Sequence, residues 1–308
     1  MNLLRDSQAL RLRRRGAAFF TACALVGVTV LSSGTASAHP AIHLGEGGNG
    51  TYLALGDSVA FGYVPSAALP PPDYSNASNF TSYANDVAQS LGLNLSNASC
   101  PGETTGSMID VSAHSNGCEN YLGNVAYGYR TNYPLHVTYS GSQLAYAVAY
   151  LRSHPHTRLV TIDIGANDAF VCQTVTTDNC ASPTEFYGVL GAIEANLTTI
   201  YHAIRVEAHY THALVALDYY SLSYTDPVQL VLSEALNQAI AAPTLAAHGI
   251  VADGFGAFQA ASASSGGDPC VAGLLIKLPD GTCNIHPSPL GHEVLAQAIL
   301  QALAAKGS

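Results

Sequence analysis

The sequence alternates short apolar runs of strand length with longer stretches of helical pattern. Residues 52–55 and 159–164 are two such runs, and each ends directly at a glycine. Short apolar runs bounded by turn residues are typical of buried strands, and their alternation with helices indicates βαβ units around a parallel sheet. We therefore predict an α/β fold, in which ligands bind outside the carboxyl ends of the strands.

Further elements continue this alternation. Helical patterns cover residues 83–91, 142–152, 184–208, 228–245 and 289–305, and residues 213–217 and 250–252 are further apolar runs of strand length. Residues 56–58 and 165–168 directly follow two of the predicted strands. Both segments are therefore expected at the ligand-binding edge of the sheet.

Two long loops interrupt the pattern. Residues 65–82 contain three consecutive prolines and a run of Asn and Ser, a composition from which we expect no packed element. Residues 116–141 contain Tyr121, Tyr127, Tyr129, Tyr133 and Tyr139. Long loops in a compact domain often serve as lids or binding loops. The alternative, to which we give equal weight, is that both are surface loops without a functional role.

The N-terminus has the three parts of a secretory signal peptide. Five arginines precede an apolar stretch at residues 17–31, which Ala36-Ser37-Ala38 follows as a small-residue cleavage site. A membrane anchor would need about 20 apolar residues. We therefore predict a signal peptide at residues 1–38, a single domain at residues 39–308 and an extracellular location.

The charge balance argues against nucleic acid as a partner. The chain has 11 basic and 21 acidic residues, and the predicted leader contains five of the former and one of the latter. The remaining six basic and twenty acidic residues leave a net charge of −14. A phosphate backbone is bound through clustered basic residues, which this chain lacks.

The cysteines indicate disulfides. Cys23 lies within the predicted leader, so six of the seven cysteines remain, an even number in a chain expected to be exported. Six cysteines allow fifteen pairings. Their grouping along the chain suggests Cys100–Cys118, Cys172–Cys180 and Cys270–Cys283. A zinc site is the alternative, but the sequence contains no CxxC spacing.

Four short motifs carry the chemistry of the chain. They are Gly-Asp-Ser at residues 56–58, Pro-Gly at 101–102, Gly-Ala-Asn-Asp at 165–168 and His-Pro at 286–287. In this order they resemble the four blocks of the SGNH hydrolases, also called GDSL esterases and lipases, over residues 51–304. The resemblance implies a flavodoxin-like three-layer α/β/α sandwich and ester hydrolysis without a metal or cofactor. The tyrosine-bearing loop resembles an elaboration of the secreted bacterial branch.

The resemblance also implies the role of each motif residue. Ser58 would be the nucleophile and His286 the general base, since an unassisted hydroxyl is a weak nucleophile at neutral pH. The oxyanion hole would consist of the backbone N–H groups of Ser58 and Gly102 and the side-chain amide of Asn167. Glycine at position 102 suits a backbone that approaches the substrate closely.

The chain departs from the family pattern at one position. The family usually has aspartate three residues before the base histidine, and this chain has Cys283 there. Three groups could orient His286 instead: the Cys283 backbone carbonyl, the Asn284 side-chain oxygen or Asp280. We favour the carbonyl, because orienting a histidine needs only an acceptor at Nδ1. The expected machinery is a Ser–His dyad with Asp280 as a possible third member.

Other polar residues near the motifs have structural interpretations. Asp57 and Asp168 could suggest a glycosidase pair, but we interpret them as residues that order their own loops and cap the adjoining helix. His292 is a rival base that falls within the last helix. No set of histidines has acidic or thiolate partners at metal-binding spacing, so no metal site is predicted.

Together these features predict a secreted, monomeric serine esterase or lipase acting on lipid or lysophospholipid esters. A carbohydrate O-deacetylase is the enzymatic alternative. A non-catalytic binding protein on the same fold is the other alternative, because the usual aspartate is missing. No integral membrane segment is expected after cleavage of the leader.

Overall fold

The computed structural model describes residues 50–307. The predicted signal peptide at residues 1–38 lies outside the described residues. Within the described part, no helix is long and apolar enough to cross a membrane.

Five parallel strands form the central sheet. They are β1 (Thr51–Gly56), β2 (Asn94–Asn97), β3 (Thr157–Asp163), β4 (Ala213–Leu217) and β5 (Ile250–Ala252), in the spatial order β2-β1-β3-β4-β5. The four strands predicted from apolar runs are confirmed. The prediction missed β2 because its sequence, Asn-Leu-Ser-Asn, contains only one apolar residue, which suits an edge strand with one neighbour.

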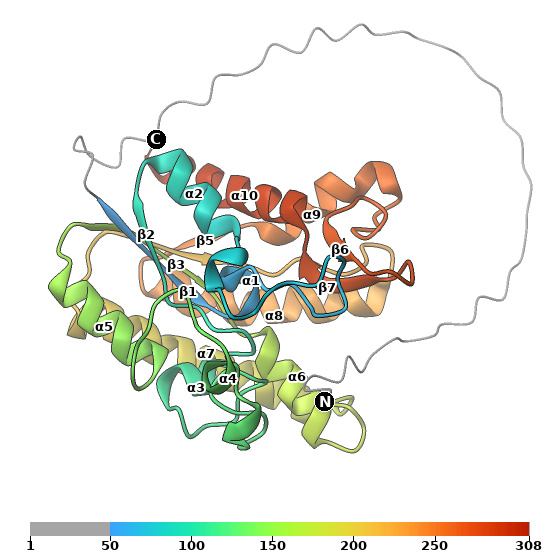
Figure 1. The fold of residues 1–308 in the computed structure, drawn as a ribbon, viewed down its shortest axis with the longest axis horizontal. Coiled ribbons are helices and arrows are strands. Elements are labelled where there is room, and N and C mark those ends of the chain that lie inside the picture. Colours follow the sequence, from blue (N-terminus) through green and yellow to red (C-terminus); the bar gives the residue numbers. More distant parts are fainter. Residues whose placement is uncertain (1–49, 308) are drawn as a thin grey trace, which may run out of the picture. The chain divides into compact units, whose positions relative to one another are not determined.

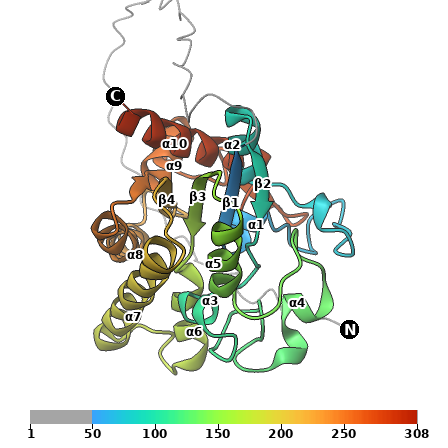
Figure 2. The ribbon, with the colours of Figure 1, turned by 90° about the vertical axis from the view of Figure 1, so that its left-hand side faces the viewer.

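Helices cover both faces of the sheet, so the predicted three-layer α/β/α fold is confirmed (Figures 1 and 2). One layer contains α2 (Tyr83–Leu91), α9 (Gly254–Ser262) and α10 (Pro289–Gly307). The opposite layer contains α3 (Thr105–Ile109), α5 (Gln143–Ser153), α6 (Ala166–Val175), α7 (Pro183–His202) and α8 (Pro227–Ala246). A π-helical turn, η3 (Ala203–Glu207), extends α7.

The register of the sheet aligns the carboxyl ends of β1 and β3, the two strands that the Gly-Asp-Ser and Gly-Ala-Asn-Asp motifs follow. Leu55 pairs with Ile162 and Gly56 with Asp163, so β1 and β3 end side by side. Residues 52–55 of β1 are fully buried, because helices cover both faces of this strand. The segments that follow β1 and β3 are therefore adjacent at the carboxyl edge.

The expectation that residues 65–82 contain no packed element is wrong. Ala77 and Phe80 are buried in a second apolar cluster with Phe61, Tyr63 and Tyr129. A 3₁₀ turn, η1 (Ala77–Asn79), shapes this segment. The loop packs because its aromatic residues, together with those of the tyrosine-bearing loop, supply a core that the Pro-Asn-Ser composition obscures.

The tyrosine-bearing loop contains two short elements of its own. These are η2 (Val125–Tyr127) and α4 (Tyr129–Asn132). Arg130 forms an ion pair with Glu119 at 2.8 Å and donates to two carbonyls of the same loop. The loop is thus a folded segment with internal polar contacts.

A small hairpin precedes the last helix. It consists of β6 (Leu275–Lys277) and β7 (Cys283–Pro287), after the 3₁₀ turn η4 (Ala263–Ser265). The structure contains the three disulfides suggested by the cysteine grouping, Cys100–Cys118, Cys172–Cys180 and Cys270–Cys283. The last of these attaches β7 to the turn that follows η4.

Candidate active site

The structure brings Ser58 and His286 into hydrogen-bond contact. Ser58 is the first residue of α1 (Ser58–Phe61) and follows β1 after a single residue. His286 lies in β7, the second strand of the hairpin that precedes the last helix. Its Nε2 lies 2.9 Å from the Ser58 Oγ, although the two residues are 228 positions apart. This is the contact that a nucleophile and its base require.

Asn284 orients the imidazole of His286. The Asn284 Oδ1 lies 2.5 Å from the His286 Nδ1 and also accepts from the His286 backbone N–H at 3.1 Å. Because both hydrogen bonds use Oδ1, the oxygen end of the amide faces the ring. The acceptor obliges Nδ1 to carry the proton, which leaves the Nε2 lone pair for the Ser58 hydroxyl.

The two other groups considered for this role do not fill it. The prediction that the Cys283 backbone carbonyl orients His286 is wrong, because the Asn284 side-chain oxygen is the acceptor at the His286 Nδ1. Asp280 is exposed, and its carboxylate accepts from the backbone and the hydroxyl of Thr282. Both of these contacts lie within the hairpin turn. Among the described residues, no hydrogen bond joins Asp280 to His286.

Burial lowers the pKa of His286 to about 4. Asn284 is neutral and supplies no negative charge that would favour the imidazolium. The imidazole is therefore neutral and able to accept a proton throughout the neutral range.

The three expected oxyanion donors follow three adjacent strands. Ser58 follows β1, Gly102 follows β2, and Asn167 lies in the first turn of α6 after β3. The Ser58 N–H is in the first turn of α1, where helical N–H groups have no intrahelical acceptor. Gly102 has φ +83°, and a Cβ there would lie 2.5 Å from the Asn116 carbonyl oxygen, so the position requires glycine.

Asp57 joins the nucleophile turn to Asn167. Its Oδ1 accepts from the Val59 N–H at 2.9 Å, which confirms its interpretation as a residue that orders its own turn. Its Oδ2 accepts from the Asn167 Nδ2 at 3.0 Å and from the Tyr219 hydroxyl at 2.6 Å. Burial raises the pKa of Asp57 to about 6, against the lowering effect of these hydrogen bonds.

Asp168 does not cap its own helix, so that interpretation is wrong. It lies inside α6, whose N-cap is Gly165, and its carboxylate accepts from the Thr105 N–H at 2.9 Å and the Thr105 hydroxyl at 2.6 Å. The side chain therefore holds α3 to α6. With Asp57 and Asp168 both committed to internal contacts, the structure does not favour a glycosidase pair.

His292, the rival base, is structural. It is buried in α10, and its Nδ1 accepts from the Tyr83 N–H at the start of α2 at 3.3 Å. Burial lowers its pKa to about 3. His292 thus joins two helices of one layer.

Sequence reasoning missed Gln143 and Tyr219. Gln143 is fully buried, accepts from the Gly56 N–H at 2.6 Å and donates to the Gly56 carbonyl at 3.0 Å. It therefore holds the glycine that precedes the nucleophile turn. Neither residue lies in a recognisable motif, and only the folded chain brings them to the site.

One group of candidate metal ligands occurs among the described residues, Cys100, Glu103 and Cys118. The two cysteines form a disulfide with each other, so neither offers a thiolate. This group is therefore not a candidate metal site.

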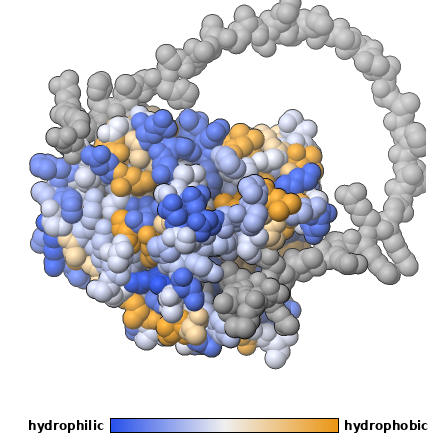
Figure 3. Space-filling view, viewed as in Figure 1, coloured by the Kyte–Doolittle hydropathy of each residue, from blue (hydrophilic) through white to orange (hydrophobic). Residues whose placement is uncertain are grey.

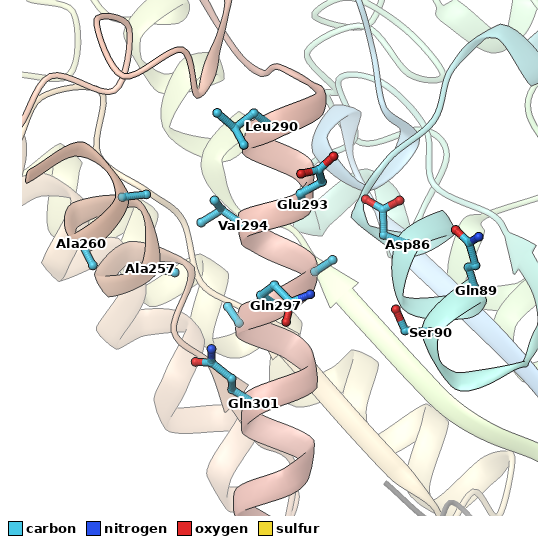
Figure 4. Close-up of a pocket in the computed structure, with 13 residues that line it drawn as sticks. Asp86, Gln89, Ser90, Ala257, Ala260, Leu290, Glu293, Val294, Gln297 and Gln301 are labelled. Atoms are coloured by element: carbon cyan, nitrogen blue, oxygen red, sulfur yellow. The ribbon is translucent and has the colours of Figure 1, made fainter. Parts of the chain in front are cut away.

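A groove lies apart from these residues, between α2, α9 and α10 (Figure 4). Asp86 and Glu293 line it, and burial together with the Glu293 charge raises the pKa of Asp86. Its lining includes neither Ser58 nor His286.

Among the solved structures that match this chain are three enzymes of low sequence identity. An α/β hydrolase enzyme from the metagenome of Lake Arreo is 17% identical, with 84% of this chain and 97% of that chain covered and a TM-score of 0.46. An acetylxylan esterase from Geobacillus stearothermophilus is 17% identical, with 82% and 94% covered and a TM-score of 0.48. A lipase from a goat rumen metagenome is 16% identical, with 82% and 96% covered and a TM-score of 0.49.

A search of curated proteins finds no match. A family model does match: the GDSL-like lipase/acylhydrolase family aligns with residues 54–294, a span that contains all four motifs. On this evidence the chain belongs to the GDSL-like lipase/acylhydrolase family of SGNH-type hydrolases and is a carboxylic ester hydrolase.

Proposed function

We propose that this protein is a secreted serine esterase or lipase that works through an acyl-enzyme on Ser58. The observation that carries the proposal is the 2.9 Å contact between the Ser58 Oγ and the His286 Nε2. The three disulfides support secretion, because such bonds persist in oxidising compartments. The signal-peptide pattern at residues 1–38 supports it independently.

The reaction has two steps. The Ser58 oxygen attacks the ester carbonyl carbon while His286 Nε2 takes the hydroxyl proton, and the carbonyl electron pair moves onto oxygen. The N–H groups of Ser58, Gly102 and Asn167 stabilise this oxyanion. Its collapse expels the alcohol, which receives the proton from His286. Water then repeats the sequence on the acyl-enzyme and releases the acid.

Asn284 takes the place of the usual aspartate in this scheme. An asparagine that presented its NH₂ group to the ring would force the wrong tautomer of the histidine. Here the His286 backbone N–H holds the Asn284 Oδ1 toward the ring. The machinery is thus Ser58, His286 and a neutral orienting amide.

Replacing Asn284 by aspartate is expected to raise the pKa of His286, because a carboxylate beside Nδ1 favours the imidazolium. The acid limb of the kcat/KM profile should move to higher pH by about 1–2 pH units. In the native protein the imidazole stays neutral down to about pH 4. In the variant it becomes protonated, and activity falls, at a higher pH. The measurement is kcat/KM between pH 3 and 9.

Asp280→Asn is the matched control, since it removes an exposed carboxylate from the same hairpin. It should leave both the profile and kcat unchanged. A loss of turnover in Asp280→Asn as severe as that in His286→Ala would instead make Asp280 a member of the machinery.

Exposed apolar side chains in the two long loops and next to His286 support an acyl substrate. Leu69 is 73% exposed in the first long loop, Tyr127 is 47% exposed in the second, and Ile285 is 39% exposed beside His286. On the face drawn in Figure 3, apolar side chains form patches between hydrophilic areas. We therefore favour lipid or lysophospholipid esters over acetylated carbohydrate.

A fluorophosphonate probe tests the proposal directly. The intact protein should be labelled at Ser58, as read by peptide mass spectrometry, and should hydrolyse p-nitrophenyl esters. A folded protein that is neither labelled nor active would be a non-catalytic binding protein. Rates across C2 to C12 acyl chains separate the substrate classes, because a preference for acetyl would favour the carbohydrate O-deacetylase.

A further inference from the structure

We propose that Asn116 is a positioning residue that holds two oxyanion donors, Gly102 and Asn167, in place. The inference rests on the proposed function, because it concerns the same oxyanion hole. Asn116 is the first residue of the tyrosine-bearing loop and is partly buried. No catalytic motif of the sequence contains it.

The side chain of Asn116 sets the orientation of the Asn167 amide. The Asn116 Nδ2 donates to the Asn167 Oδ1 at 2.8 Å, while the Asn167 Nδ2 donates to the Asp57 Oδ2 at 3.0 Å. An ionised carboxylate only accepts, so the nitrogen end of Asn167 must face Asp57 and its oxygen end must face Asn116. One N–H of Asn167 remains for an oxyanion, in a direction set by the other two bonds.

The backbone of Asn116 sets the position of Gly102. The Asn116 N–H donates to the Gly102 carbonyl at 2.8 Å. The Asn116 carbonyl oxygen lies 2.5 Å from the ideal position of a Gly102 Cβ, too close for any side chain at that position. The two backbones are therefore in direct contact. The hydrogen bond from the Asn116 N–H stabilises Gly102 in its positive-φ conformation.

The Cys100–Cys118 disulfide joins these two segments covalently. Cys100 lies two residues before Gly102 and Cys118 two residues after Asn116, with a Cα–Cα distance of 5.6 Å. The cross-link limits the movement of the Asn116 segment relative to the Gly102 segment, and it therefore supports the contacts between them. Asn116 thus links the disulfide-anchored loop to the donors.

Loss of the Asn116 side chain is expected to raise the free energy of the transition state and to leave that of the bound substrate unchanged. The oxyanion forms only during reaction, so a misplaced donor lowers kcat and leaves substrate binding unchanged. Asn116→Ala should lower kcat by about 10- to 100-fold, less than the roughly 10²- to 10³-fold expected for direct removal of the Asn167 donor. The KM for p-nitrophenyl butyrate should stay within about threefold, as for loss of an interaction made in the transition state.

A trifluoromethyl ketone provides a second readout. Ser58 adds to its carbonyl carbon, His286 takes the hydroxyl proton, and the ketone oxygen becomes an oxyanion in the hole. The inhibition constant should rise by the same factor by which kcat falls in Asn116→Ala. Asn132→Ala is the matched control, since Asn132 donates only to carbonyls of its own loop, and this variant should match the native protein in both readouts.

A double-mutant cycle decides how Asn116 acts. If its side chain acts through Asn167, the variant with both residues replaced by alanine should be no slower than Asn167→Ala alone. Independent, multiplying losses would overturn the proposal, as would native kcat in Asn116→Ala. Asn116→Asp keeps the shape of the side chain but presents an acceptor to the Asn167 Oδ1, so it should also lower kcat. An inactive native protein would instead refute the proposed function itself.

Discussion

Ser58→Ala is expected to lower kcat for a short-chain ester by about 10⁵- to 10⁶-fold. Without the hydroxyl no acyl-enzyme forms, and neither His286 nor the oxyanion donors can replace the attacking atom. KM should change little, because a serine hydroxyl contributes little to ground-state binding. The measurement is steady-state hydrolysis of p-nitrophenyl butyrate, with loss of fluorophosphonate labelling as an independent readout.

Two controls make this result specific to the nucleophile. Ser112→Ala removes an exposed hydroxyl that contacts only Asp110, and it should retain native turnover. The melting temperature of Ser58→Ala should match that of the native protein, because the Ser58 side chain is only partly buried. Native turnover in a correctly folded Ser58→Ala would falsify the assignment of the nucleophile.

His286→Ala is expected to lower kcat by a similar factor, about 10⁵- to 10⁶-fold at pH 7. The serine then has no base within hydrogen-bond reach among the described residues, since His292 is committed to the Tyr83 N–H. The variant is assayed across pH 5 to 10. Its rate should increase with hydroxide concentration, whereas the native rate should level off in the neutral range, where the imidazole is already deprotonated.

Non-additivity provides the decisive comparison for the pair. A nucleophile and its base act as one unit, so the variant lacking both Ser58 and His286 should be no slower than either single variant. His156→Ala, which removes an exposed imidazole, should leave kcat unchanged. Turnover of the native size in His286→Ala would exclude His286 as the base.

Periodicity predicted most of the strands and helices and the parallel sheet, because continuous apolar runs and helical patterns reflect burial directly. The helix predicted at residues 83–91 coincides with α2, and the one at 142–152 differs from α5 by one residue at each end. The edge strand β2 and the packed segment at residues 65–82 were missed. Their stability comes from neighbours distant in sequence, which local composition does not record.

Motif spacing was less informative about how the site is held together. Gly102 and Asn167 follow β2 and β3, the two strands that flank β1, so only the order of the strands places both at the edge where Ser58 lies. Asn284 was only one of three options for orienting His286. Two hydrogen bonds to a single oxygen decide this choice, and such bonds depend on a hairpin whose twist and position no local pattern specifies.

The sequence by itself determined the α/β class and the family and predicted the principal reactive groups, because each depends on residue type and order along one strand or turn. The tertiary structure alone decided which side chains orient those groups. Asn284, Asp57 and Asn116 act through hydrogen bonds of about 3 Å or less, a distance set by the packing of separate segments. The apolar runs and motifs are local signals, whereas the geometry of the site exists only once the sheet, the hairpin and the Cys100–Cys118 loop are assembled.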